Sequence, residues 1–445
     1  MSKLNGIKVA LISLGCDKNR VDSEVMLGLL AREACVFTPD LTEAAAIIIN
    51  TCGFLQEAVA EAKEEIERAL EQKRAGRCRA VIVTGCAAQR YRELFERDEI
   101  DAVMGVHEYN HIADVMKAVF DADPAHVTPV THVTHVTPAE YVGRVLSTPG
   151  HYAYLKIAEG CDKTCTYCTI PAIRGPYRSR TMQSLADEAA KLAAQNVKEL
   201  VLVAQDTTLY GMDIYGRQTL HELLQELSKI DGIRWIRLLY CYPEHIYDDF
   251  ITEMAQNPKV VPYVDMPMQH AADRILKLMG RRSTRAGLRA TIAKLRDAIP
   301  IVTLRTTLIA GFPGETKADF TELCNFIKET QFDRLGVFAY SREEGTPAYG
   351  LDGHLEEKTK YARADRLMKI QQKISTEKLM DKIGNTMEVL IEGTRDDIYF
   401  GRSHADAPEI DGIVYIKSRE PLKAGQFVKV HIKESTEYDL IGEPL

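Results

Sequence analysis

The stretch YAYLKIAEGCDKTCTYC, residues 152–168, decides the fold of the central part of the chain. Its first seven residues form a β-rich run of strand length, and three cysteines follow in the loop with three and then two residues between them. A tight loop that carries three thiolates can bind three irons of one cluster, which would leave the fourth iron open for a substrate. A structural zinc ion would need a fourth ligand, and the motif supplies none.

Strand-like runs alternate with helical stretches on the carboxyl side of this motif. The later helical stretches are predicted at Thr316–Thr330 and, long and charged, at Glu356–Asp381. Six strand–helix repeats predict an open or partial TIM-type barrel, in which the chemistry lies at the carboxyl ends of the strands. The six predicted strands are Tyr152–Ala158, Glu199–Ala204, Arg234–Leu239, Val260–Asp265, Ile301–Ile309 and Arg334–Ala339.

The amino-terminal part of the chain shows the same alternation on a smaller scale. Compact apolar runs of strand length lie at Ile7–Leu14, Ala46–Asn50 and Ala80–Thr84, and a helical stretch rich in Ala, Glu and Lys spans Glu57–Gln72. Such alternation predicts a parallel sheet covered by helices. Ligands of these sheets bind beyond the carboxyl ends of the strands.

After Gly384 the pattern changes to short β runs separated by Gly, Pro and Asp turns, which predicts a small antiparallel barrel of four or five strands. Between the first two regions, His-Val-Thr recurs from His126 to Thr137; such a tract suits an extended linker, and a His-rich tract can also bind metal. The sequence therefore predicts an α/β multidomain protein. Its parts are an N-terminal parallel α/β sheet domain (6–122), a linker (123–146), a partial TIM-type (β/α)6 barrel (147–381) and a small antiparallel β-barrel (382–445).

Composition excludes several classes of protein. The 445 residues are 45% hydrophobic and 27% charged, which excludes global disorder, and the net charge of −8 excludes a chain that coats nucleic acid by bulk charge. Ten cysteines are too dilute for a disulfide scaffold. The start lacks the pattern of a signal peptide and no run approaches the ~20 apolar residues of a membrane span, so we expect a cytoplasmic protein with reduced thiols.

A second set of cysteines is recognised by position. Cys16, Cys52 and Cys86 each follow one of the first three predicted strands, and each has a glycine beside it. Taken singly, each is most simply a small buried hydrophobe. Because the carboxyl ends of parallel strands meet at one edge, the three together predict a second cluster site with three thiolates. The remaining four cysteines share no such placement and are assigned to packing: Cys35, Cys78, Cys241 and Cys324.

The three-cysteine loop resembles that of the radical S-adenosylmethionine superfamily. The resemblance implies a 4Fe-4S cluster held by Cys161, Cys165 and Cys168, whose open iron is chelated by S-adenosylmethionine. It also implies reductive cleavage of that cofactor to methionine and a 5′-deoxyadenosyl radical. Tyr167 occupies the position where the superfamily usually carries an aromatic residue near the adenine.

Other strand ends match the cofactor-binding loops of this superfamily. The glycines Gly311 and Gly314 follow the fifth barrel strand and suit a cofactor-contacting loop, although such a loop can also be a plain turn. The pair Gln205 and Asp206 ends the second strand where relatives carry a Gly-Gly-Glu type motif, from which this chain departs. Gln269 ends another strand, together with Pro267 and His270; the histidine can equally be structural.

The order of the parts resembles the methylthiotransferase family over nearly the whole chain. The resemblance implies a C-terminal TRAM domain, two 4Fe-4S clusters and two molecules of S-adenosylmethionine, with the auxiliary cluster carrying the sulfur. It also implies an external electron donor and sulfur source and no membrane. No catalytic side chain beyond the cluster ligands is implied, since the cofactor carries the difficult chemistry.

The two branches of this family differ in substrate. One modifies adenosine in tRNA, and the other modifies the β-carbon of an aspartate in protein twelve of the small ribosomal subunit. Residues 382–445 carry 8 Lys+Arg and 12 Asp+Glu, a net charge of −4, which disfavours RNA as the main substrate and suits a basic ribosomal protein. The acidic surface can also be a solvated face without a role. A third reading is a non-catalytic iron–sulfur binding or assembly protein.

Three strings resemble the ribosomal-protein branch. In Ser13–Glu24 the residue after Cys16 is Asp17, where that branch often has proline; this departure affects the loop but not the ligand. The second string is Asn50–Phe54. The third, Gly401–Gly412, falls in the predicted C-terminal barrel, where we expect the substrate to be selected.

Overall fold

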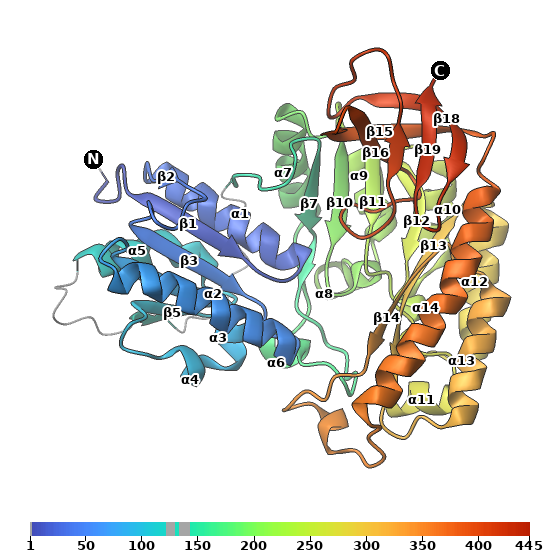
Figure 1. Ribbon diagram of the computed structural model, residues 1–445, viewed down its shortest axis with the longest axis horizontal. Coiled ribbons are helices and arrows are strands. Elements are labelled where there is room, and N and C mark those ends of the chain that lie inside the picture. The colour runs from blue at the N-terminus through green and yellow to red at the C-terminus, as the bar shows by residue number, and fades with distance from the viewer. Residues whose placement is uncertain (1, 122–129, 133–142) are drawn as a thin grey trace. The chain divides into compact units, whose positions relative to one another are not determined.

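The computed structural model describes residues 2–121, 130–132 and 143–445, which form two compact units (Figure 1). Apart from the short strand Val130–His132, the His-Val-Thr repeat lies outside the described residues. No helix in the described ranges is both long and apolar enough to cross a membrane. Unit 1 comprises Met1–Ser147, Glu159–Lys163 and Cys168–Arg180, and unit 2 comprises Thr148–Ala158, Thr164–Tyr167 and Thr181–Leu445.

Unit 1 is built on a six-stranded parallel sheet, as the sequence predicts. All residues of the two central strands β3 and β4 are buried, because helices cover both faces. Alternate residues point to opposite faces: Ile47 and Ile49 pack with helix α2, whereas Ile48 packs with helices α1 and α5. The strands, in sheet order, are β2 (Val36–Phe37), β1 (Lys8–Ser13), β3 (Ala46–Thr51), β4 (Ala80–Gly85), β5 (Ala102–Met104) and β6 (Val130–His132).

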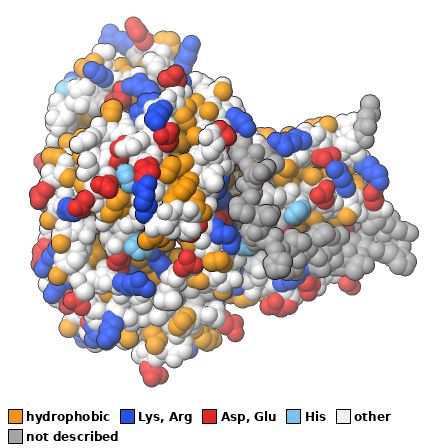
Figure 2. Space-filling model, turned by 180° about the vertical axis from the view of Figure 1, so that it is seen from behind, with side chains coloured by type: hydrophobic (Ala, Val, Ile, Leu, Met, Phe, Trp, Pro, Cys, Tyr) orange, Lys and Arg blue, Asp and Glu red, His pale blue; other side chains and the backbone are white. Residues whose placement is uncertain are grey.

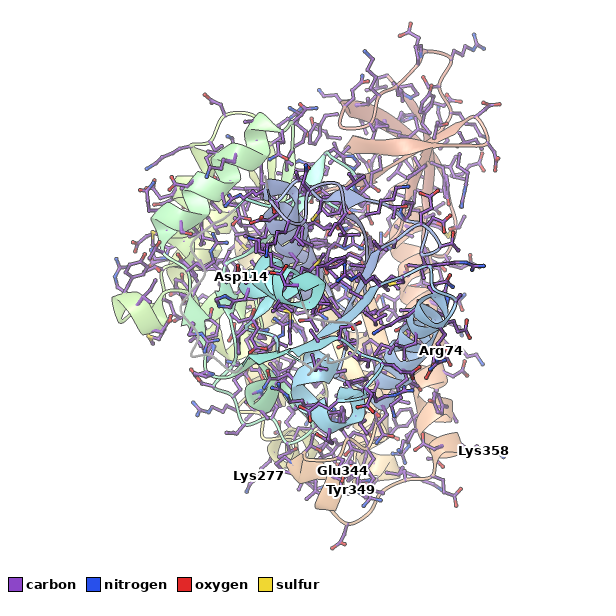
Figure 3. All side chains as sticks on the ribbon, turned by 90° about the vertical axis from the view of Figure 1, so that its left-hand side faces the viewer. Arg74, Asp114, Lys277, Glu344, Tyr349 and Lys358 are labelled. Carbon is purple, nitrogen blue, oxygen red and sulfur yellow. The ribbon has the colours of Figure 1, made fainter. Side chains whose placement is uncertain are left out.

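The helices of unit 1 surround this sheet (Figure 1). The predicted helix Glu57–Gln72 extends slightly further, to Arg74, whose guanidinium points away from the sheet and pairs with Glu99 at 2.6 Å (Figure 3). The helices are α1 (Asp17–Arg32), α2 (Gln56–Arg74), α3 (Cys86–Arg90), α4 (Arg92–Phe95), α5 (Ile112–Asp121) and α6 (Ile170–Arg174), with the short two-stranded sheet of β8 (Ala158–Glu159) and β9 (Arg178–Ser179).

Unit 2 contains a second six-stranded parallel sheet, which confirms the predicted partial barrel. Its edge strands are β14 and β7, and helices cover its outer face (Figure 1). In sheet order the strands are β14 (Arg334–Ala339), β13 (Thr303–Ala310), β12 (Val260–Asp265), β11 (Trp235–Leu238), β10 (Glu199–Val203) and β7 (Tyr152–Lys156). The main helices are α7 (Met182–Ala194), α9 (Leu220–Ser228), α10 (Asp248–Gln256), α12 (Arg285–Ala298), α13 (Lys317–Thr330) and α14 (Glu357–Met380), with short helices α8 (Met212–Tyr215) and α11 (Asp273–Leu278).

The C-terminal residues form a closed five-stranded barrel within unit 2. Every neighbouring pair is antiparallel except β17 with β19, which is parallel. The prediction of an antiparallel barrel is therefore corrected at one pair, because an odd number of strands in a closed ring cannot alternate in direction throughout. The strands are β15 (Thr386–Arg395), β16 (Ile398–Ser403), β17 (Val414–Ile416), β19 (Leu440–Pro444) and β18 (Phe427–Ser435).

The loop after β16 is buried against the amino ends of the unit 2 sheet. Arg402 Nη2 donates to Glu199 Oε2 at 2.6 Å, and Glu199 is the first residue of β10. Tyr263 donates its hydroxyl to Asp411 at 2.6 Å. The carboxyl ends of the strands lie at the opposite end of unit 2, near α11 (Figure 1). The segment from β16 onward thus closes the end of the unit 2 sheet at which its strands begin, and the expectation that it selects the substrate stays a prediction.

We expect Arg402→Met to lower the free energy of unfolding by about 3–5 kcal/mol, because it removes one partner from a fully buried carboxylate. Chemical denaturation checks this change against Arg419→Met, an exposed arginine of the same barrel. The control is expected to stay within about 0.5 kcal/mol of the parent chain. Equal stability of the two variants would contradict a role of this ion pair in joining the barrel to the sheet.

The same pair predicts a pH dependence. Burial raises the pKa of Glu199, but Arg402 and Arg237 outweigh it and hold the pKa below its usual range. A carboxyl whose pKa is lowered by folding stabilises the fold above its unfolded pKa, and this contribution is lost as the pH falls through the folded pKa. The stability difference between the parent chain and Arg402→Met should therefore shrink in acid.

Candidate functional site

The three cysteines of unit 1 lie at one edge of its sheet. Each follows a strand: Cys16 comes directly before α1, Cys52 follows β3, and Cys86 begins α3 immediately after β4. The register aligns Ser13, near Cys16, with Asn50 of β3, which in turn aligns with β4. Burial raises the pKa of the Cys52 and Cys86 thiols, and the nearby Cys16 raises both further. The structure thus brings together the residues that the sequence placed at equivalent strand ends.

The cysteine loops of unit 1 approach one another closely. Gly15 has a φ of +91°, and a Cβ at this position would lie 2.8 Å from the Cβ and 3.1 Å from the Sγ of Cys52. A side chain here would force the first two loops apart. Cys86 is buried and Cys16 is exposed, so one side of this edge remains open to a ligand.

Asn19 connects all three cysteine loops of unit 1, a role that the sequence did not reveal. Its Nδ2 donates to Leu14 O at 3.1 Å, ahead of Cys16, and to Thr51 O at 3.0 Å, next to Cys52. Its Oδ1 accepts a long contact of 3.6 Å from the Sγ of Cys86. One amide group thereby sets the spacing of the loops that carry the three thiols.

Three thiols that follow adjacent strands at one sheet edge are the donor set that an iron–sulfur cluster takes. Within the described residues, no group of three or more His, Cys, Asp or Glu side chains lies close enough to hold one metal ion. The thiolates of a cluster each bind a different iron, so they lie farther apart than the ligands of one ion. Burial raises the pKa of the Cys86 thiol to about 11, and Arg174 opposes this shift. A bound metal would supply the positive charge that the buried thiolate requires.

Cys161 and Cys168 are held by backbone contacts within unit 1. Cys161 N donates to Gly175 O at 3.0 Å, which ties the start of the loop to the end of α6. The Sγ of Cys168 accepts a hydrogen bond from Ile170 N at 3.4 Å, as α6 begins. Backbone amides that donate hydrogen bonds to the cysteine sulfurs commonly stabilise a bound cluster.

Cys165 belongs to unit 2. Two residues that the sequence did not indicate lie near it: Tyr242, which contacts its sulfur, and Arg281, which contacts Tyr242. Its Sγ lies 3.0 Å from the hydroxyl of Tyr242, which follows β11, and the guanidinium of Arg281 lies 3.8 Å from the centre of the tyrosine ring. Thr166 N donates to Met279 O at 3.0 Å and fixes the loop. The strand-end position of Tyr242 was a usable signal, whereas nothing in the sequence near Arg281 marks it as a neighbour of Cys165.

Tyr167 and the loop that begins at Gly311 pack in the same apolar cluster. Phe312 is fully buried in an apolar cluster with Tyr340, and Tyr167 packs against that cluster. Gly311 has a φ of +79°, and a Cβ there would lie 2.6 Å from the Cγ of Lys360 in α14. A glycine is therefore required at this position for packing against α14. Gly314 N donates to Gly353 O at 2.9 Å, which anchors the end of the loop.

Asp206 is already engaged by neighbouring side chains. Its carboxylate accepts hydrogen bonds from the amide of Thr208 at 3.0 Å and from its hydroxyl at 2.6 Å, and it pairs with His245 Nδ1 at 2.8 Å. The side chain is 1% exposed, whereas His245 is 26% exposed. Gln205, beside it, is half-buried. Asp206 therefore orients His245, another residue that the sequence analysis missed.

Gln269 and His270 lie in the segment that follows β12, a few residues beyond the end of the strand at Asp265. Gln269 has a φ of +71°, and its backbone pairs with Thr307 and Ile309 of β13, which fixes an uncommon turn at the strand end. His270 is fully buried, accepts Ala272 N at Nδ1 (3.0 Å) and lies 3.3 Å from Glu315 through Nε2. The burial of His270 and these contacts favour a structural role, one of the two readings that the sequence left open. Lys277 of α11, Glu344 and Tyr349 lie near one another at one end of unit 2 (Figure 3).

We expect Tyr242→Phe to shift the midpoint potential of a cluster bound at Cys165 to more negative values, because hydrogen bonds to cluster sulfurs favour the reduced state. Redox titration in a chain with Cys16, Cys52 and Cys86 replaced by alanine isolates this signal. Tyr247→Phe, which loses a hydroxyl contact to His221 instead, is the matched control. A potential that is identical in the two variants would contradict the contact.

Three family models match the chain in the order of its parts. They are uncharacterized protein family UPF0004 over residues 8–105, the Radical SAM superfamily over residues 155–327 and a TRAM domain over residues 383–445.

Two structures of the radical S-adenosylmethionine methyltransferase TsrM from Kitasatospora setae share the fold. The one with tryptophan and a cofactor analogue has a TM-score of 0.54, 16% identity and coverage of 74% of this chain and 72% of that chain. The one with cobalamin and a [4Fe-4S] cluster has a TM-score of 0.55, 14% identity and coverage of 88% and 80%. Fold and site together define a radical S-adenosylmethionine enzyme.

Curated relatives match almost end to end. Proteins named ribosomal protein uS12 methylthiotransferase RimO are 49% identical in Acetivibrio thermocellus, with 98% of each chain covered, and 48% identical in Clostridioides difficile, with 99% of each chain covered. The chain belongs to the RimO family of methylthiotransferases. It is a transferase whose cofactors are 4Fe-4S clusters and S-adenosylmethionine.

Proposed function

We propose that this chain transfers a methylthio group to the β-carbon of an aspartate in ribosomal protein uS12, protein twelve of the small subunit. The observation that carries the proposal is the presence of two separate sets of three cysteines, one at the carboxyl ends of three strands of the unit 1 sheet and the other in the single loop that follows β7 and β8. The near full-length relatives carry the name of this activity. A reaction that needs both a radical and a sulfur source requires two such sites.

We propose that one set, Cys161, Cys165 and Cys168, holds the radical cluster, and that the other, Cys16, Cys52 and Cys86, holds the auxiliary cluster. When bound, the clusters and S-adenosylmethionine supply the radical and the methylthio group. The chain itself holds the thiolates through Asn19 in unit 1 and through Tyr242 beside Cys165 in unit 2.

We further propose that S-adenosylmethionine lies at the carboxyl ends of the unit 2 strands. Tyr167 and the loop from Gly311 to Gly314 share an apolar cluster that suits the adenine, and Gln205 and Gln269 supply polar groups after β10 and β12. Asp206 contributes by orienting the partly exposed His245. The proposed bounds of the parts remain 6–122, 123–146, 147–381 and 382–445.

The net charge of the C-terminal barrel indicates the chemical class of the substrate. The net charge of −4 over residues 382–445 favours a basic protein over RNA as the main substrate. On the face drawn in Figure 2, blue and red side chains are interspersed over unit 2 rather than gathered into a basic band. We propose that the reaction occurs in the cytoplasm, on a protein rather than at a membrane, with an external electron donor and an external sulfur source. The alternative is the tRNA branch of the family.

The proposal is tested with reconstituted chain, S-adenosylmethionine, a reductant and purified protein twelve. Mass spectrometry of the substrate peptides should show one methylthio group in place of a hydrogen on an aspartate. Substrate in which that aspartate is replaced by alanine should stay unmodified. Failure of the fully iron-loaded, reduced protein to cleave S-adenosylmethionine would instead indicate an iron–sulfur binding or assembly protein.

A further inference from the structure

Arg174 is a fully buried arginine beside the cysteines of unit 1, and neither the sequence analysis nor the proposed function gives it a role. It is the last residue of α6, six residues after Cys168, and it is 1% exposed. A guanidinium cannot lose its charge in a protein, so a buried arginine needs partners that offset its desolvation. The identity of those partners indicates what the residue does.

The guanidinium of Arg174 connects the segments that carry both sets of cysteines. It donates at 2.8 Å to Glu159, two residues before Cys161, and at 3.3 Å to Asp22 in α1, the helix that follows Cys16. It also donates to the Oδ1 of Asn19. Every one of these residues belongs to unit 1.

The contact with Asn19 makes Arg174 a clamp on the cysteine loops. Asn19 can donate to Leu14 O and Thr51 O only while its Nδ2 faces them, and Arg174 enforces this orientation by binding Oδ1 on the other side. The same Oδ1 faces the Sγ of Cys86. Loss of the guanidinium would leave the amide free to rotate away from the loops.

The charge of Arg174 also acts on the sulfurs directly. The guanidinium and the Sγ of Cys86 contact the same oxygen, Oδ1 of Asn19, so the fixed positive charge lies close to that sulfur. In a buried setting such an interaction is weakly screened. Reduction adds negative charge to a cluster, so a fixed cation nearby favours the reduced form.

We propose that Arg174 is a positioning residue of the auxiliary cluster: it orients Asn19 across the three cysteine loops and raises the reduction potential of the cluster bound there. The inference rests on the proposed assignment of Cys16, Cys52 and Cys86 to that cluster. It links the auxiliary site to the segment that carries Cys161 and Cys168, because the same guanidinium holds Glu159.

The experiment uses the full chain with Cys161, Cys165 and Cys168 replaced by alanine, so that iron bound after reconstitution reports on the auxiliary cluster. Redox titration followed by electron paramagnetic resonance gives its midpoint potential. Arg174→Met should shift the potential to more negative values, and Arg174→Lys, which keeps the charge, should restore much of it. Glu159→Gln, which removes a negative charge with almost no change of shape, should shift the potential in the opposite direction.

Arg32→Met is the control, because Arg32 is exposed and stands at the far end of α1, roughly 24 Å along the helix from Cys16. It should leave the potential unchanged. An unchanged potential in a fully loaded Arg174→Met chain would overturn the inference; should that variant not load iron, an unchanged potential in Glu159→Gln would overturn it equally. If the background chain itself binds no cluster, the assignment of the auxiliary cysteines fails, and the inference fails with it.

Discussion

Replacing Cys161 by alanine is expected to abolish cleavage of S-adenosylmethionine, with 5′-deoxyadenosine falling to the level formed without protein. The reason is that three thiolates are the minimum that holds a cluster with one open iron, and no spare cysteine lies in the loop. Chromatography of the products after reduction with dithionite measures the effect. Loss of cleavage removes the radical, so methylthio transfer should be lost as well.

The matched control for this variant is Cys324→Ala. Cys324 is buried in α13, and the sequence assigns it to packing. Its replacement should preserve cleavage and lower only stability, since it creates a small cavity. Cleavage above background in Cys161→Ala, or equal loss in Cys324→Ala, would contradict the assignment of the loop.

The second large effect is expected for Cys52→Ala. This variant should still cleave S-adenosylmethionine but should transfer no methylthio group, because Cys52 lies at the sheet edge of unit 1 and outside the loop that starts at Cys161. Parallel measurement of 5′-deoxyadenosine and of substrate mass separates the two activities. We expect cleavage at the level of the parent chain and complete loss of methylthio transfer.

Cys78→Ala provides the comparison for Cys52→Ala within the same unit. The Cys78 thiol is buried and contacts Ala80 O at 3.1 Å, so it packs against the sheet. Both activities should survive in this variant. If Cys52→Ala instead lost cleavage and transfer equally, the idea of two separate clusters would be wrong.

Most of the fold was predictable because hydrophobic periodicity reports on burial. Strand β14 was predicted with its observed bounds, Arg334–Ala339, and β3 and β4 were predicted to within one residue, since their apolar runs are unbroken. Strand β2, of two residues, was not predicted because so short a segment has no period. The parallel pairing of β17 with β19 was missed because pairing depends on ring closure and not on local sequence.

The candidate site was predictable only in part, for a related reason. Residues at strand ends could be placed from the sequence, as for Cys16 and Cys86, because parallel strands share an edge. Asn19 and Arg174 meet across 155 positions of sequence, and such a contact leaves no local pattern. The contact of Arg281, in the loop after α11, with the ring of Tyr242 likewise leaves no local pattern in the sequence.

The string Gly401–Gly412 lies on the C-terminal barrel, as predicted, in the second half of β16 and the loop that follows it. Its residues resemble the ribosomal-protein branch, but nothing in the string indicated which of its side chains are buried. The structure buries Arg402 and Asp406 against the amino ends of the unit 2 strands. Arg402 and Asp406 therefore join the barrel to the sheet, and the selection of the substrate by this string stays a prediction.

The most direct test of the central claim is a competition in one vessel. Reconstituted chain, S-adenosylmethionine and reductant are incubated with equal amounts of protein twelve and unmodified tRNA, and both are analysed by mass spectrometry. The account predicts a methylthio group on one aspartate of the protein and none on the tRNA. Modification of the tRNA with none on the protein would contradict it.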